Sequence, residues 1–341
     1  MARSPRANAA IVTLAALAAA GWWMRAAPPS FGTFEGDAMA TRWRVVVPAT
    51  ARATAEADAC FELYRSLDHD LSEWKPDSPL SAVNAAAGRA PVAVPQDLFD
   101  LVARSLAIGR ETGGAFDPSW AALWGVWDFR SVPPRVPDSR AIDARRAFVD
   151  YRAVRLDAAT RSIFLPRAGM KLGLGAIGKG YALARAEALL SSRGERDFLL
   201  LGGGQVVARG SRGDRPWEVG IRDPRGTPDD WFARLPLVDA SLSTSADDES
   251  YFIVDGVRYG HILDPRTGWP ARGLRSATVL HRDPVLADAL STALFVLGDA
   301  RGFAIVERLG GEALVVDDAG RVRFTPGLRD RLEILHAPRA R

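Results

Sequence analysis

The chain reads Leu172-Gly173-Leu174-Gly175-Ala176-Ile177-Gly178-Lys179-Gly180 near its middle and continues directly into a helix-forming run, residues 181–190. Four glycines in eight residues remove side chains where the backbone must come close to another group. The helix that follows would direct its free N–H groups at that same group. A glycine-rich loop ahead of a helix N-terminus is typical of a phosphate-binding site.

This stretch fits two nucleotide-binding patterns and is specific for neither. Residues 173–178 match G-x-G-x-x-G, and residues 173–179 match G-x-x-x-x-G-K. The second pattern fails at Gly180, where a P-loop has a Ser or Thr for magnesium. The first is weakened because the nearest predicted strand, 162–166, ends before the glycines begin. A glycine-rich turn ahead of an ordinary amphipathic helix remains a third interpretation.

Composition indicates an ordinary globular protein. The 341 residues can bury a substantial core, in two domains or one large one, and 48% are apolar while 25% are charged. Net charge is only +3 and the basic residues are spread along the chain, so we expect no nucleic-acid partner. The single cysteine, Cys60, excludes an intramolecular disulfide and is expected to be a buried thiol.

The N-terminus predicts export. Arg3 and Arg6 precede an apolar run at 9–24, and Ala18 to Ala20 offer small residues for a signal peptidase. We therefore expect residues 1–30 to be an export signal, or an N-terminal membrane anchor with a linker. Residues 31–341 would then lie on the periplasmic side of the bacterial inner membrane, either secreted or tethered, with membrane contact only through the N-terminus.

Periodicity and turn residues predict a mixture of helices and short strands. Helical spacing occurs at 51–70, 98–108, 181–192 and 285–297. Strands are predicted at 41–47, 163–165, 198–201, 206–209, 217–221, 241–244, 251–254 and 277–280. Neither a strict βαβ alternation nor an internal repeat is visible, so the predicted class is α+β, with mixed sheets and flanking helices.

Two polar clusters follow predicted strands. The first is Ser243-Thr244-Ser245 with the acids 247–249, for which a polar turn or helix cap is the simpler interpretation. The second places His261, Asp264 and Arg266 within six residues between a strand and a Pro/Gly turn, so that they can converge on one ligand. His261 fits either acid–base chemistry or a structural hydrogen bond.

A third cluster lies on a predicted helix. Asp288 and Thr292 are four residues apart, so they share a face of a segment that is otherwise apolar and should be buried. A buried carboxylate is costly unless a cation or several donors meet it. Carboxylate and hydroxyl oxygens suit Mg²⁺, whose shell is often completed by phosphates.

In its motifs and in their order along the sequence, the chain resembles the ApbE-type FAD:protein FMN transferases, from about Phe34 to Gly298. The motifs that carry the resemblance are 39–41 (Met-Ala-Thr), 72–80 with Asn84, 113–117 (Gly-Gly-Ala-Phe-Asp), 123–125 (Leu-Trp-Gly), the glycine stretch, 201–203 (Leu-Gly-Gly), 243–245, 261–268 (His-Ile-Leu-Asp-Pro-Arg-Thr-Gly) and 287–292 (Ala-Asp-Ala-Leu-Ser-Thr).

The resemblance implies a Mg²⁺-dependent transfer of the FMN half of FAD to a Thr or Ser hydroxyl of a target protein, through a phosphoester bond, with release of AMP. It implies one flavin transferase domain over 31–341, in which FAD could lie between two lobes. FAD would be contacted by Met39, Trp74, Ala115, Phe116, Asp117, Lys179 and Ile262. Mg²⁺ would be held by Ala176 through its carbonyl, Asp288, Ser291 through its carbonyl, and Thr292. His261, or an acid near it such as Asp264, is the candidate for activating the acceptor hydroxyl.

Acceptors would be redox proteins of the cell envelope with an Asp-Gly-x-Thr-Ser/Ala-Thr type of site. Three positions depart from the family pattern: Gly173 stands where an acid is usual, Gly204 where an acid or Asn is usual, and Ala246 where Gly is usual. Two alternatives stay open, the first because it would use the same Mg²⁺ and phosphate geometry and the second because Gly173 could mark a decayed site. One is an FAD pyrophosphatase that passes FMN to water, and the other is a flavin-binding envelope protein without turnover.

Overall fold

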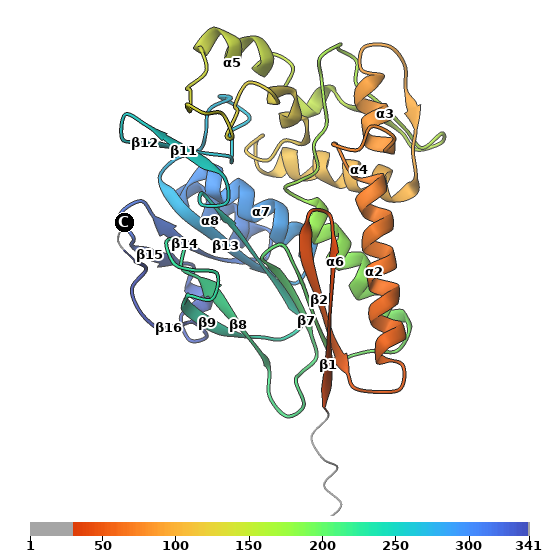
Figure 1. Ribbon diagram of the computed structural model, residues 1–341, viewed down its shortest axis with the longest axis vertical. Helices are drawn as coiled ribbons and strands as arrows, with labels where there is room; N and C mark the ends of the chain where they lie inside the picture. Colours follow the sequence, from red (N-terminus) through yellow and green to blue (C-terminus); the bar gives the residue numbers. More distant parts are fainter. Residues whose placement is uncertain (1–29, 340–341) are drawn as a thin grey trace, which may run out of the picture.

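The computed structural model describes residues 30–339, and its centre is an eight-stranded sheet (Figure 1). Every neighbouring pair of strands in this sheet runs antiparallel. In order across the sheet, the strands are β1 (Phe31–Ala38), β2 (Thr41–Pro48), β6 (Phe198–Gly202), β7 (Gln205–Arg209), β10 (Ala240–Ala246), β13 (Leu274–His281), β14 (Glu312–Asp317) and β15 (Val322–Phe324).

Both faces of this sheet are buried, and its strand sequences reflect this. On β2, Val45 and Val47 join the core on one face, whereas Val46 joins the core on the other. Residues 313–316 of β14 divide between the two faces in the same way. Successive side chains of a strand point to opposite faces, so a strand covered on both sides reads as a continuous apolar run.

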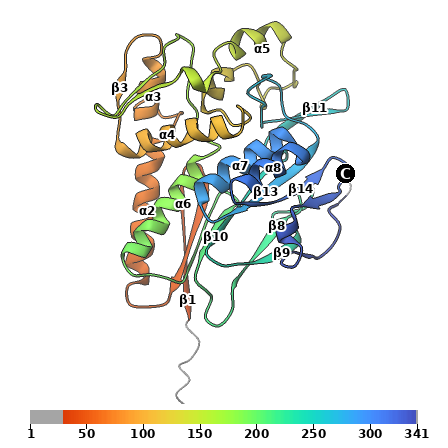
Figure 2. The same ribbon diagram turned by 180° about the vertical axis from the view of Figure 1, so that it is seen from behind.

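Helices cover one face and a second sheet covers the other, which gives three layers (Figures 1 and 2). The covering helices are α2 (Ala53–Asp70), α6 (Gly178–Ser192), α7 (Pro284–Leu297) and α8 (Asp299–Arg308). The second sheet has the strand order β16 (Glu333–Ile334), β9 (Trp231–Leu237) and β8 (Trp217–Arg222). Of these helices, α7 lies across β10 and β13 and packs directly on α6.

The remaining elements lie mostly at the top of Figure 1. They are the helices α3 (Pro79–Ala85), α4 (Gln96–Glu111) and α5 (Ser139–Arg146), the small sheet β3 (Val92–Ala93), β5 (Ser162–Phe164) and β4 (Arg155–Asp157), and the hairpin β11 (Tyr251–Val254) and β12 (Val257–Gly260). Short 3-10 helices are η1 (Pro118–Leu123), η2 (Tyr151–Ala153) and, near the C-terminus, η3 (Pro326–Leu328).

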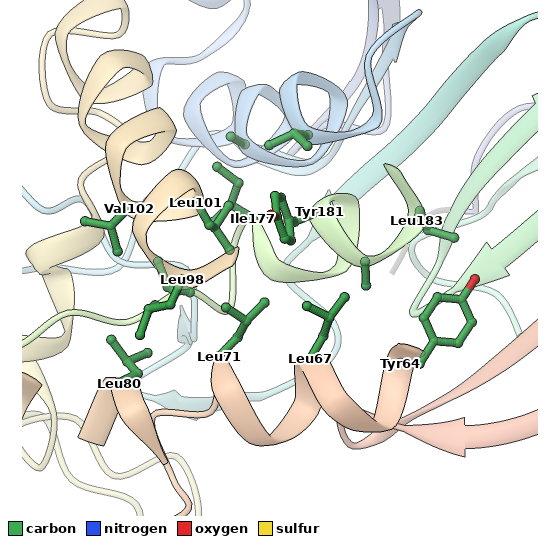
Figure 3. Packing of buried hydrophobic residues seen from close by; sticks show 14 of the residues in the cluster. Tyr64, Leu67, Leu71, Leu80, Leu98, Leu101, Val102, Ile177, Tyr181 and Leu183 are labelled. Atoms are coloured by element: carbon green, nitrogen blue, oxygen red, sulfur yellow. The ribbon is translucent and has the colours of Figure 1, made fainter. Parts of the chain in front are cut away.

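The largest core joins α2, α4 and α6. Figure 3 shows Leu67 and Leu71 of the α2 region packed toward Leu98 and Leu101 of α4 and toward Ile177, the residue before α6. Full burial of one such side chain is worth about 1.5–3 kcal/mol. Through Ile177, this core fixes the glycine-rich loop to helices that lie far from it in the sequence.

The α+β class is confirmed, and all four predicted helices form, as α2, α4, α6 and α7. The predicted strands correspond to β2, β5, β6, β7, β8, β10, β11 and β13. Several elements were not predicted, among them β1, β9, β14, α3, α5 and α8. In β1 the apolar pattern is interrupted by Gly32 and Gly36, and the strand is defined by its residue-for-residue pairing with β2.

Cys60 is buried and unpaired, as predicted, and burial raises the pKa of its thiol to about 12. The predicted export signal, with its apolar run at 9–24, lies outside the described residues. Within residues 30–339, no helix is both long and apolar enough to cross a membrane.

Candidate functional site

The loop ahead of α6 is fixed by side chains from distant segments. Asn84 of α3 binds Leu172 twice, since its Nδ2 donates to the carbonyl at 2.9 Å and its Oδ1 accepts from the N–H at 2.7 Å. The Glu73 carboxylate accepts from the N–H of Leu174 at 3.0 Å. A loop that is ordered before its ligand arrives loses less conformational entropy on binding.

Close packing explains two glycines of this stretch. A Cβ atom on Gly180 would lie 2.5 Å from the carbonyl oxygen of Pro284 and 2.7 Å from the Cβ of Asp288, so glycine lets α6 approach α7. A Cβ atom on Gly173 would lie 3.0 Å from Nε1 of Trp120. Gly180, which breaks the P-loop pattern, and Gly173, one of the three departures from the family pattern, both stand where a side chain has little room.

Asp288 projects from α7 onto the N-terminus of α6. It is 5% exposed, and its Oδ2 accepts from the N–H of Gly180 at 2.7 Å. Burial raises the pKa of Asp288, while the nearby Lys179 ammonium and the Gly180 N–H act in the opposite direction. The predicted burial of this carboxylate is confirmed, and a cation placed beside it would relieve its desolvation.

A free carbonyl oxygen accompanies this carboxylate. Gly180 is the third residue of α6, so its N–H is one of the first four of the helix, which have no carbonyl partner within the helix. Here that N–H donates to Asp288, and the Ala176 carbonyl accepts no hydrogen bond from any described residue. The Ala176 oxygen is thus available to a ligand.

Hydroxyl groups from β10 and α7 meet next to Asp288. The Ser245 Oγ lies 2.8 Å from the Ser291 Oγ and 3.1 Å from the Thr292 Oγ1. Ser291 is fully buried and donates its hydroxyl to the carbonyl of Asp288 at 2.8 Å. The serine cluster expected to be a polar turn is therefore part of a strand, and its last member contacts two predicted metal ligands.

Among residues 30–339, no group of three or more His, Cys, Asp and Glu side chains gathers as a metal-binding cluster. The predicted magnesium ligands differ from such a cluster because they comprise one carboxylate together with carbonyl and hydroxyl oxygens. Oxygen donors of these kinds are the ones that Mg²⁺ prefers. The donor chemistry around Asp288 therefore fits the predicted ion.

Lys179 and Met39 flank the loop on the side of β1 and β2. The Lys179 Nζ lies 3.4 Å from the carbonyl oxygen of Gly175, and its stem crosses Gly203, where a Cβ atom would overlap it. Met39 has a φ of 49°, in the left-handed region that strains a non-glycine residue. A hollow of about 660 Å³ lies beside it, lined by residues 37–42 and Asp68.

Three tryptophan side chains cluster beside the loop. Trp74 is 72% exposed and stacks on Trp124, with ring centroids 4.2 Å apart and planes 15° apart. Trp120 meets Trp124 edge-on and donates its Nε1–H to the carbonyl of Gly173 at 3.2 Å. An exposed ring of this kind offers a stacking surface for another flat ring.

The predicted FAD contacts at 115–117 lie near η1. Ala115 and Phe116 are buried, and Asp117 is 6% exposed. The Asp117 carboxylate accepts from the N–H and hydroxyl of Ser119, at 2.7 and 2.6 Å, and from the N–H of Tyr151 at 3.2 Å. This side chain therefore holds the turn at η1 together.

His261 and Asp264 differ in whether their side chains already have hydrogen-bond partners. The carboxylate of Asp264 is held by the guanidinium of Arg266 through two contacts of 2.8 Å. The Nε2 of His261 lies 3.8 Å from the carboxylate of Glu249, and its Nδ1 is buried without a hydrogen-bond partner among the described residues. Ile262, a predicted FAD contact, is partly buried against the core around α7.

Sequence reasoning did not single out Glu73, Asn84, Trp124 or Ser245 as site residues. Each was part of a motif, but its role depends on a partner far away in the chain. Burial raises the pKa of Glu73 to about 7, while the Leu174 N–H and the Lys179 ammonium act in the opposite direction. In the sequence, the signal for Glu73 was an acid directly before a tryptophan, Trp74, whose exposure only the structure shows.

Comparisons with known proteins agree on one family. The chain matches the model of the ApbE family over residues 39–315. It is 36% identical over 303 residues to the FAD:protein FMN transferase of Treponema pallidum, with 84% of each chain covered.

Solved structures agree. The ApbE protein of Thermotoga maritima is 32% identical with a TM-score of 0.81, covering 89% of this chain and 99% of that one. The apo form of the Pseudomonas stutzeri flavinyl transferase ApbE is 28% identical with a TM-score of 0.79, covering 90% and 98%.

Proposed function

The chain belongs to the ApbE family and is a transferase, and from this premise we propose that it transfers the FMN half of FAD to a Thr or Ser hydroxyl of a target protein and releases AMP. The relatives named above support flavin transfer as the activity. The acceptor hydroxyl, the released nucleotide and the role of magnesium are parts of the proposal.

The observation that carries the proposal is that a buried carboxylate, Asp288, and an ammonium, Lys179, lie near each other at a glycine-rich helix N-terminus. The Lys179 ammonium and the N–H groups of this turn are complementary to phosphate oxygens. The Asp288 carboxylate would repel those oxygens unless a cation lay between them. A pyrophosphate with a divalent cation satisfies both groups, and FAD contains a pyrophosphate.

Mg²⁺ would be held by the Ala176 carbonyl, the Asp288 carboxylate, the Thr292 hydroxyl and the Ser291 carbonyl. When bound, it would neutralise charge on the pyrophosphate as the phosphorus–oxygen bond breaks. The support is the free carbonyl of Ala176 together with the desolvated carboxylate of Asp288.

FAD would be placed by groups on both sides of the loop. We propose contacts with Lys179 at the phosphates, with Met39 and Trp74 at the rings, and with 115–117 and Ile262 around them. The exposed face of Trp74 supports a stacking role. The buried carboxylate of Asp117 supports an indirect one, in which it fixes the turn that touches FAD.

In the transfer, the acceptor oxygen forms a bond to the phosphorus of the FMN half, the bridging bond to AMP breaks, and the acceptor hydroxyl loses its proton. We propose that His261 receives this proton, because its side chain is one-third exposed and its Nε2 lies 3.8 Å from Glu249, beyond hydrogen-bond distance. Asp264, held by Arg266, would instead fix the loop that carries His261.

The place of action is proposed from the N-terminus. The basic and apolar run at 1–30 supports export to the periplasmic side of the inner membrane, in a secreted or tethered form. FAD and redox proteins of the envelope would be the partners.

The test uses the full chain in detergent with FAD, MgCl₂ and an acceptor protein that carries an Asp-Gly-x-Thr-Ser/Ala-Thr site. We expect flavin fluorescence that stays with the denatured acceptor, AMP in equal amount, and loss of both when EDTA removes divalent cations. AMP without labelled acceptor would instead support the FAD pyrophosphatase. Bound FAD without any AMP would support a flavin-binding protein.

A further inference from the structure

The β11–β12 hairpin carries exposed apolar side chains on an open strand edge. Tyr251 is 41% exposed and Ile253 is 53% exposed, whereas Phe252 between them is 7% exposed. Within the described chain, β11 pairs with β12 alone, and the hairpin projects from the body of the molecule (Figures 1 and 2). Proteins usually protect such an edge, because it can pair with another chain.

The backbone groups of this edge can be assigned from the pairing register. Ser250 accepts from the N–H of His261 at 2.9 Å, and the register continues with Phe252 opposite Tyr259. Antiparallel pairs alternate between bonded and non-bonded, so the N–H and C=O groups of Tyr251 and Ile253 point away from β12. In the described residues no hydrogen bond is made by these four groups.

The hairpin is held firmly from its inner side. Phe252 and Tyr259 pack on Trp127, with ring centroids 6.3 and 5.7 Å away, and Trp269 meets Trp127 edge-on at 5.3 Å. The two-residue Asp255–Gly256 turn has both φ values positive, as hairpin turns of this length require. The open edge is therefore preorganised, which lowers the entropic cost of adding a strand.

The free edge of β11 lies close in sequence to residues of the candidate site. β10 ends at Ala246, next to Ser245 and its contact with Thr292, and β11 starts only a few residues later. β12 ends at Gly260, directly before His261. A segment paired along β11 would thus leave the edge beside Glu249 and His261, where the proposed transfer needs a protein hydroxyl.

From this geometry we infer that the free edge of β11 binds the acceptor protein by β-strand addition. A short extended segment of the acceptor pairs with the outward backbone groups of Tyr251 and Ile253. Its side chains rest on Ile253 and beside the Tyr251 ring, over which the Arg258 guanidinium lies at 3.6 Å. The residue that follows the paired segment delivers its hydroxyl to the site. This inference rests on the proposed function, because it names how the protein substrate of that reaction is held.

The test compares proline substitutions on two edge strands in the full chain. Ile253→Pro removes an outward N–H without disturbing the pairing to β12, as proline is tolerated at such positions. Ile334→Pro is the matched control, because Ile334 is also on an edge strand and is 43% exposed. Its N–H also points outward, since the next residue, Leu335, donates to Phe232. Ile253→Thr keeps the N–H and separates the side-chain contribution.

For Ile253→Pro we expect the KM for the acceptor protein to rise by about tenfold, the change that corresponds to one or two net hydrogen bonds. The Kd for FAD, read from flavin fluorescence, should stay within about twofold of the unaltered chain, the scatter expected of a surface change. Ile334→Pro should leave both values unchanged. Ile253→Thr should give a smaller rise in KM than Ile253→Pro.

Any one of four results would overturn the inference. An unchanged KM in Ile253→Pro would exclude the edge as the acceptor site. An equal loss of FAD affinity would show that the substitution acts through the fold. Concentration-dependent dimers of the unaltered chain that Ile253→Pro abolishes would assign the edge to a second copy. Absence of any transfer by the unaltered chain would overturn the proposed function as well, whereas transfer that ignores Ile253→Pro overturns this inference alone.

Discussion

At the scale of single residues, Asp288 decides whether the site can hold a cation. Its carboxylate is nearly closed to solvent, and in the absence of a cation its hydrogen bond to the Gly180 N–H compensates only part of the lost hydration. Holding an ionised carboxylate at this position without a cation therefore costs stability. That cost turns into binding free energy when a divalent ion arrives.

Asp288→Asn separates these two effects. Because it removes a desolvated charge, the metal-free variant should unfold at the same temperature as the unaltered chain or higher, but the rise in Tm on adding MgCl₂ should disappear. Turnover of FAD should fall by at least about 100-fold, the scale of losing one electrostatic contact to a transition state. Asp299→Asn on α8, an acid paired with Arg323, is the control and should keep both. Full Mg²⁺-dependent turnover in Asp288→Asn would refute the metal site.

Glu73 predicts a pH dependence of stability. Burial raises the pKa of Glu73 from 4.5 to about 7, so the folded state holds a proton that the unfolded state has lost between these values. The unfolding free energy should therefore fall as pH rises from 4.5 through 7, by up to about 3 kcal/mol at roughly 1.36 kcal/mol per pKa unit.

Glu73→Gln should remove this decline and be more stable than the unaltered chain at pH 8, measured by urea unfolding without Mg²⁺ or FAD. Glu62→Gln, at an exposed position of α2, should keep the decline. Parallel pH profiles for Glu73→Gln and the unaltered chain would show that Glu73 does not carry the effect.

The two acids also show what sequence can reveal at this scale. Asp288 was predicted to be buried because it stands in an apolar helix, where its neighbours in sequence are also its neighbours in space. Glu73 stands in a polar turn, and its burial comes from a loop whose partner residue, Leu174, is far along the chain. The residues next to Glu73 in the sequence do not predict this long-range contact.

At the scale of elements, the approach of α6 to α7 builds the site. Gly180 allows the N-terminus of α6 to contact Pro284 and Asp288, and this contact places the Gly180 N–H against the carboxylate. The helices themselves were predictable from apolar spacing, because period and length are local properties. Their crossing was not, since it depends on a missing Cβ atom at one residue.

Gly180→Ala tests this packing. In a helix, alanine would ordinarily gain about 1 kcal/mol over glycine. Here the new Cβ would overlap a carbonyl oxygen and a Cβ atom, so we expect a net loss of roughly 1–3 kcal/mol in unfolding free energy, together with weaker Mg²⁺ binding. Gly175→Ala, where the nearest atom would be 3.7 Å away, is the control and should unfold at nearly the same urea concentration. Equal stability of the two variants would contradict the proposed role of Gly180.

At the scale of the whole molecule, one sheet gathers strands from both ends of the described chain. β2 pairs with β6, and β13 pairs with both β10 and β14, so the site lies where early, middle and late segments meet. The strands could be predicted from Val45–Val47 and similar runs, but such runs fit any buried neighbour. Their order depends on long-range pairing, which composition and periodicity do not encode.

The C-terminal segment adds the edge strand β16 to the second sheet, which covers the face of the central sheet opposite the helices. β16 pairs with β9, and the backbone N–H of Arg339 donates to Oδ2 of Asp223 at 2.8 Å. Asp223 is fully buried, so this donor compensates a desolvated carboxylate. The side chain of Arg339, by contrast, is 58% exposed in its pair with Asp230. The main chain of the segment should therefore matter more for stability than its charge.

A chain that ends at Leu332 loses β16 and the donor to Asp223, and we expect its unfolding free energy to fall by roughly 2–4 kcal/mol. Arg339→Ala keeps the backbone donor and removes only an exposed ion pair, so it should cost no more than about 1 kcal/mol. Urea unfolding of both variants measures the difference. FAD binding by the folded fraction should be the same in each, because Asp223 lies in the loop between β8 and β9 whereas the site is built on β10, α6 and α7. If the truncated chain and Arg339→Ala were equally stable, the side chain of Arg339, and not the backbone of the segment, would account for its contribution to stability. If the truncated chain folded but did not bind FAD, the second sheet would influence the site on the opposite face of the central sheet.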